Sequence, residues 1–137
     1  SETICVKGDG SKQVLWTNNQ KCYEQSMLAV EGYVYAVTDP GVAFCWRGHD
    51  GQEMWKQRLQ GPVSSSPVLV GDNIYSTNEA GLTYVFKANP QQYEEVAQNQ
   101  LEGEGFATLA VCGHRIYVRT ASGDGPQRQE WLYCIGQ

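Results

Sequence analysis

The sequence predicts an all-β protein in which short antiparallel strands recur in units of about forty residues. Two observations carry this prediction. Three apolar hairpins end in Val-Tyr or Ile-Tyr, at Tyr35, Tyr75 and Tyr117, in steps of 40 and 42 residues. The chain also has 15 glycines and 11% aromatic residues but only 18% charged residues, a composition typical of strands joined by tight turns.

The expected strands follow the same order in each unit. Each hairpin supplies two strands, and the three hairpins are 28–35, 68–75 and 110–117. The expected third strands, each after a glycine turn, are 42–46, 82–86 and 131–135. The expected fourth strands are 52–59 and about 95–101. Near the N-terminus, 3–6 resembles a third strand and 13–17 a fourth, so that Trp16 and Trp55 occupy equivalent places. Only the tract 90–97 offers a candidate for a helical turn.

Four antiparallel strands per unit of about forty residues are typical of a β-propeller blade. The whole chain, 1–137, is then one propeller segment of about three and a half blades, with units 1–20 (partial), 26–60, 66–102 and 106–137 (partial). A β-sandwich also has evenly spaced short strands, but it does not explain why Tyr, Gly and Trp recur in phase. Rings usually have about 4–8 blades. We therefore expect either the C-terminal part of a longer propeller or two chains joined edge to edge, with 13–17 of one chain completing the last sheet of the other.

Several residues match a known repeat. Gly51 and Trp55 lie four positions apart, Ser66 and Pro67 open the next expected strand, and Trp16 precedes Trp55 by 39 residues. These residues resemble the repeat of the pyrroloquinoline-quinone (PQQ)-like propellers, which reads Ala-x-Asp-x-x-Thr-Gly-x-x-x-Trp before a Ser-x-Pro strand. That family includes quinoprotein alcohol dehydrogenases and non-enzymatic relatives. The resemblance covers nearly the whole chain and implies a propeller fold, without implying an activity.

The chain departs from this repeat at several positions. Cys45 stands in the Ala place, Arg47 in the Asp place and Asp50 in the Thr place. Either Val96 or Ala97 falls where the third unit should have its Trp. In the family that Trp packs flat on the backbone of the next blade. The resemblance therefore implies a weaker joint after the third unit.

Composition excludes some partners. The formal net charge is −5, whereas nucleic acids and anionic membranes favour clustered Lys and Arg. No apolar run approaches the ~18 residues of a membrane-spanning helix. We therefore expect no nucleic-acid partner and no membrane span.

The sequence offers no catalytic motif. The dehydrogenases of the resembling family bind a quinone and Ca²⁺ through Asp, Glu and Asn residues, often beside two adjacent cysteines. This chain has no adjacent cysteines and no calcium-loop spacing, and His49 and His114 stand apart from one another. We expect no catalytic residue, no cofactor and no metal. The predicted function is a non-catalytic scaffold or protein-interaction module, which the resemblance places outside the cytoplasm.

Two alternatives remain at the level of sequence. The chain could be a piece of a quinone- or substrate-binding propeller whose site lies in other blades, or a sensor domain fused to another module such as a kinase. We expect the in-phase tyrosines Tyr35, Tyr75 and Tyr117 to pack between blades. Trp46, Trp131 and Tyr93 fall outside that series and are candidates for an exposed interface with a protein partner or with a second copy in a homodimer. The five cysteines are expected to be buried small hydrophobes rather than a disulfide framework.

Overall fold

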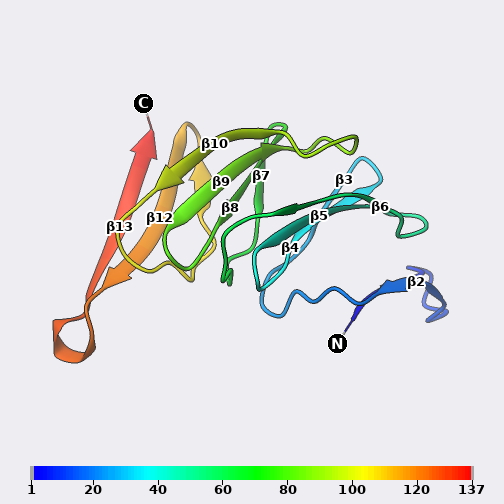
Figure 1. Ribbon diagram of the computed structural model, residues 1–137, viewed down its shortest axis with the longest axis horizontal. Coiled ribbons are helices and arrows are strands. Elements are labelled where there is room, and N and C mark those ends of the chain that lie inside the picture. Colours follow the sequence, from blue (N-terminus) through cyan, green and yellow to red (C-terminus); the bar gives the residue numbers. More distant parts are fainter. Residues whose placement is uncertain (1, 137) are drawn as a thin grey trace.

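The computed structural model describes residues 2–136, which form four antiparallel sheets that follow one another in chain order (Figure 1). The first sheet pairs β1 (Thr3–Val6) with β2 (Val14–Asn18). The strands of the second sheet are β3 (Leu28–Val30), β4 (Tyr33–Val37), β5 (Val42–Arg47) and β6 (Glu53–Arg58). Those of the third are β7 (Val68–Val70), β8 (Asn73–Thr77), β9 (Leu82–Lys87) and β10 (Glu95–Gln100). Those of the fourth are β11 (Ala110–Cys112), β12 (Arg115–Ser122) and β13 (Gln129–Gly136).

The predicted fold class is confirmed. Each complete sheet has its strands in sequence order, β3-β4-β5-β6 and then β7-β8-β9-β10, which is the arrangement of a propeller blade. The tract 90–97 forms no helix and instead leads into β10. A short 3₁₀ helix, η1 (Gly125–Gln127), lies in the loop between β12 and β13.

The repeat recurs as a shared register between the third and fourth strands of each unit. Cys5 pairs with Trp16, Cys45 with Trp55, and Val85 with Ala97. A β-bulge interrupts the pairing next to each of these pairs. Since a bulge bends the strand and re-aims a side chain, its recurrence shows that the three positions are structurally equivalent. The register therefore assigns Ala97, and not Val96, to the tryptophan position of the third unit.

Most of the core lies between neighbouring sheets. Side chains of the second and third sheets form the main cluster, which includes Tyr35, Cys45, Trp55, Ile74 and Phe86. A smaller cluster on the opposite face of the second sheet comprises Ala36, Phe44 and Trp46. The alternation along β5 explains both clusters, because successive side chains of a strand point to opposite faces. The second sheet is thus covered on two faces, as a blade within a propeller is.

Candidate functional site

Tryptophans join the first sheet to the second and the second to the third. The indole N–H of Trp16 donates to the carbonyl oxygen of Gly48 at 2.7 Å, and that of Trp55 donates to the carbonyl oxygen of Asn89, also at 2.7 Å. Gly51 has φ +72°, and a Cβ placed on it would lie 2.6 Å from Cδ2 of Trp16. The ring of Trp16 therefore packs directly on the backbone of the next sheet.

The joint between the second and third sheets is filled by aromatic rings. The ring centroid of Trp55 lies 6.0 Å from that of Tyr35, 6.2 Å from that of Phe86 and 5.7 Å from that of Tyr93. The contacts with Phe86 and Tyr93 are edge to face, a geometry that aromatic quadrupoles favour. Trp55 is 9% exposed, so this joint is a closed core.

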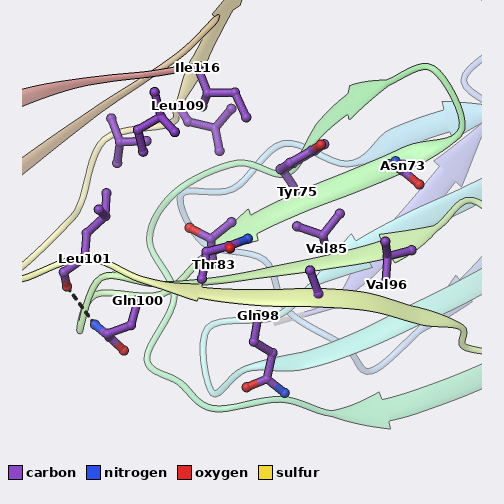
Figure 2. A pocket seen from close by; sticks show the side chains of 14 residues that line it. Asn73, Tyr75, Thr83, Val85, Val96, Gln98, Gln100, Leu101, Leu109 and Ile116 are labelled. Carbon is purple, nitrogen blue, oxygen red and sulfur yellow. Dashed lines mark hydrogen bonds between the residues drawn. The ribbon is translucent and has the colours of Figure 1, made fainter. Parts of the chain in front are cut away.

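The joint between the third and fourth sheets contains a cavity instead, with a volume of about 570 Å³. Ala97 lines it at the position where the preceding joint has Trp55. Figure 2 shows Tyr75, Thr83 and Val85 of the third sheet on one side and Leu109 and Ile116 on the other. We call this space the Ala97 cavity. It lies at the joint after the third unit, which the lack of a tryptophan in the sequence predicts to be the weaker one.

A chain of side-chain hydrogen bonds links the segments that precede the first strand of three sheets. The backbone N–H of Ser26 donates to Oγ of Ser66, and the backbone N–H of Ser66 donates to Oγ1 of Thr108, both at 2.9 Å. Pro67 is buried directly before β7, where its lack of an N–H costs no ladder hydrogen bond. Ser66 and Pro67 therefore act in the structure as connections between sheets.

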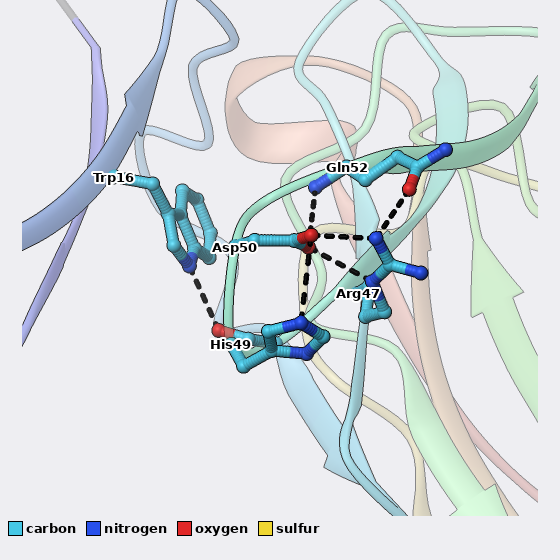
Figure 3. A network of polar contacts seen from close by, with 6 residues as sticks. Trp16, Arg47, His49, Asp50 and Gln52 are labelled. Atoms are coloured by element: carbon cyan, nitrogen blue, oxygen red, sulfur yellow. Dashed lines mark hydrogen bonds and ion pairs between the residues drawn. The ribbon is translucent and has the colours of Figure 1, made fainter.

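The turn on which Trp16 packs is held by a polar network (Figure 3). Arg47 donates to Asp50 through Nε at 3.0 Å and through Nη2 at 2.5 Å, and it also donates to the side chain of Gln52. The backbone N–H of Gln52 donates to Oδ1 of Asp50. The hydrogen bond from Arg47 holds the pKa of Asp50 well below its usual value. Arg47 and Asp50, two departures from the family repeat, thus pair with one another: a cation stands in the Asp place and an anion in the Thr place.

His49 and Ser64 take part in local contacts. Among residues 2–136, no three His, Cys, Asp or Glu side chains lie close enough together to hold a metal ion. His49 is 73% exposed and lies 3.5 Å from Asp50, which belongs to the turn network. Ser64 donates to Glu79 at 2.6 Å, and no histidine takes part in that pair. These donors do not fit the quinone and Ca²⁺ of the dehydrogenases.

The structure places the three candidate interface residues differently from one another. The expectation of exposure is wrong for Trp46, which is 2% exposed because it stacks on Phe44 and faces Trp16, with ring centroids 5.1 and 6.5 Å away. Tyr93 is partly buried against Trp55 and donates to Glu95. Only Trp131 is exposed, at 48%.

Sequence reasoning missed the apolar faces of the two terminal sheets. In the repeat, Ile4 and Val6 occupy the positions that Phe44 and Trp46 occupy in the second sheet. They are nevertheless 51% and 54% exposed, because no sheet of the described chain packs against them. Leu132, on β13, is 71% exposed. Alignment of the first repeat unit with the second would have indicated these apolar faces, because the equivalent residues of the second sheet are buried.

The cysteines divide into two groups. All five are free thiols. Cys45 is buried, and Cys5 and Cys22 are partly buried, whereas Cys112 and Cys134 are exposed. The expectation that they are all buried hydrophobes is therefore wrong for the two in the fourth sheet, where no further sheet of residues 2–136 covers their side chains.

The fold and its joints define a β-propeller segment. Residues 6–125 match the PQQ_2 family model, described as Outer membrane protein assembly factor BamB. The chain therefore belongs to this PQQ-like propeller family, as its repeat indicated. A comparison with curated proteins finds no match.

Solved structures show the same fold at low sequence identity. BamB from Moraxella catarrhalis is 14% identical with a TM-score of 0.66, over 80% of this chain and 32% of that one. The quinohemoprotein alcohol dehydrogenase from Comamonas testosteroni is 14% identical with a TM-score of 0.61, over 82% of this chain and 21% of that one. The N-terminal domain of Nup159 is 7% identical with a TM-score of 0.62, over 91% and 36%. The chain thus spans about a third or less of the length of these structures. No helix within residues 2–136 is long and apolar enough to cross a membrane.

Proposed function

We propose that this chain is a non-catalytic propeller module that binds protein through the uncovered faces of its terminal sheets. The observation that carries the proposal is the exposure of Ile4, Val6 and Leu132 on faces that the inner sheets bury. Exposed apolar groups of this kind mark interaction surfaces when they gather on one face.

The uncovered face of the first sheet and that of the fourth sheet correspond to the two faces that pack together between neighbouring sheets. In the joint between the second and third sheets, the face that carries Tyr35 and Cys45 packs against the face that carries Phe86. The fourth sheet exposes the first kind of face, where Tyr117 pairs with Cys134. The first sheet exposes the second kind, with Ile4 and Val6. A second copy of the chain, docked head to tail, is the simplest protein partner that satisfies both faces.

The free edge of β13 adds a second mode of contact. β13 pairs with β12 along eight residues, and its other edge has no partner strand among the described residues. Such an edge is a template for another strand, and 13–17 of a second copy is the segment that the sequence proposes for it. Arg119 and Glu130 form an exposed ion pair there, which limits uncontrolled pairing.

Sedimentation velocity over a range of concentrations tests self-association. We expect the mass to rise from 15.2 kDa towards twice that value, and Leu132→Lys to keep the chain monomeric, because a buried charge without a partner is costly. Gln57→Lys, on an exposed position of β6, is the matched control and should associate like the wild type. A wild-type chain that stays at 15.2 kDa throughout would overturn this docking mode.

Titration with PQQ and Ca²⁺ tests the non-catalytic part of the proposal. We expect no saturable change in the absorbance of the quinone, because the described donors do not converge on a metal-binding group. A saturable change would favour a quinone-binding propeller instead. The name of the matching family, an outer membrane assembly factor, supports an extracytoplasmic location for the module.

A further inference from the structure

The Ala97 cavity is a tryptophan site that lacks its tryptophan. The pairing of Cys5 with Trp16, Cys45 with Trp55 and Val85 with Ala97 places three side chains at one equivalent position. Indole rings occupy two of the three positions. At the third, the methyl group of Ala97 leaves space that the surrounding sheets do not close.

The residues that line the cavity are equivalent, in the repeat, to the residues that pack around Trp55. Trp55 lies against Tyr35 of its own sheet and Phe86 of the next. By register, Tyr75 and Ile135 are the equivalents of these two residues, and both line the Ala97 cavity. Unlike Tyr35, Tyr75 is only partly buried. The cavity is lined by apolar and polar side chains, and its volume of about 570 Å³ falls within the range of small-molecule pockets, about 300–1,000 Å³.

One buried polar atom in the cavity wall lacks a partner. Among the described residues, Oδ1 of Asn73 is inaccessible to solvent and accepts no hydrogen bond. Asn73 lines the cavity at the start of β8 (Figure 2). The hydroxyl of Thr83, at the opposite end of the β8–β9 pair, is already paired with that of Thr77 at 2.7 Å. A buried acceptor without a donor is costly, so a ligand that brings an N–H would remove that cost.

We propose that the Ala97 cavity binds a small planar aromatic heterocycle of the indole class. The ring lies between Tyr75 and Ile135, as the ring of Trp55 lies between Tyr35 and Phe86. Its N–H donates to Oδ1 of Asn73 after the side-chain amide turns this oxygen towards the cavity. This site is separate from the protein-binding faces proposed above, because it lies between the third and fourth sheets rather than outside them.

Methyl NMR on the chain labelled at Ile, Leu and Val tests the site, with free indole as the probe. We expect saturable shifts at Val85, Ile116 and Ile135, and none at Ile4 of the first sheet. Benzofuran, which has an oxygen in place of the N–H, should bind about two- to tenfold more weakly, the value of one neutral hydrogen bond. Shifts that do not saturate, or that appear only at Ile4, would overturn the proposal.

Variants separate this site from other modes of binding. Ala97→Trp should fill the cavity and abolish the shifts with indole, whereas Ala29→Trp, at an exposed position of β3, should leave them unchanged. Asn73→Leu provides a second test that does not depend on folding of the Ala97 variant. It should equalise the affinities for indole and benzofuran. An Ala97→Trp chain that binds indole as tightly as the wild type, or an Asn73→Leu chain that keeps the preference for indole, would contradict the assignment.

Discussion

The indole N–H of Trp55 donates to the carbonyl oxygen of Asn89, 34 residues further along the chain, at 2.7 Å. This bond joins the second sheet to the third, and the same bond from Trp16 to Gly48 joins the first sheet to the second. The stability of the segment therefore depends on contacts between sheets that single residues make.

Trp55→Ala should destabilise the chain by about 3–5 kcal/mol, the usual cost of deleting a buried aromatic side chain. The variant loses the packing against Tyr35 and Phe86 as well as the hydrogen bond to Asn89. Urea unfolding followed by circular dichroism measures the free energy of unfolding. Trp131→Ala, which removes a half-exposed ring, should cost much less. Equal losses in the two variants would show that Trp55 does not close the joint.

Gly51→Ala should destabilise more than Gly71→Ala. Both glycines have positive φ, +72° and +61°, so both substitutions bear the backbone strain of about 1–2 kcal/mol. Only the Cβ at Gly51 would also collide with Trp16, whereas nothing lies within 4 Å of a Cβ at Gly71. The difference between their unfolding free energies therefore isolates the packing of Trp16 on the turn. No difference would mean that the ring moves away without cost.

Asp50→Asn should destabilise the chain at pH 7 and progressively less below about pH 4. The hydrogen bond from Arg47 lowers the pKa of Asp50 in the folded chain from its usual 3.8. A lowered pKa contributes stability that is complete above the unfolded value and is lost as the pH falls through the folded value. Urea midpoints of the two chains at pH 7 and pH 3 measure the convergence. Since the pair is exposed, 0.5 M NaCl should reduce the difference at pH 7. A gap that widens in acid would contradict this role for Asp50.

Cys112 and Cys134 should react with a thiol reagent in the folded chain, whereas Cys45 should not. The thiolate is the reacting species, and burial raises the pKa of Cys45 to about 11. The two cysteines of the fourth sheet are exposed. Mass spectrometry after brief alkylation at pH 8 identifies the modified residues. Addition of urea should then expose Cys45. Early modification of Cys45 in the absence of urea would show that the second sheet opens readily.

The packing between sheets also explains why the expectation of an exposed Trp46 was wrong. Trp46 and Trp131 look alike in the sequence, because each lies in an expected third strand next to a charged residue. Trp46 is buried because the first sheet covers its face. Trp131 lies on the face of β13 that also carries Ile135 and looks towards the third sheet, but it stands near the β12–β13 loop and is 48% exposed. Exposure here depends on how far the neighbouring sheet reaches along each strand, which local sequence does not encode.

The sequence by itself determined the strands, their grouping and the repeat. Alternating apolar residues, turn glycines and the spacing of Trp16 and Trp55 are local signals, and hairpin pairing is largely set by neighbours in the chain. Only the tertiary structure decided that Ala97 rather than Val96 takes the tryptophan position, because a bulge shifts the register by one residue. It also decided that this position opens on a cavity and that Ile4 and Leu132 face outwards. Cavities and uncovered faces arise from the contacts between sheets, which join residues too distant in the chain for a local pattern to specify.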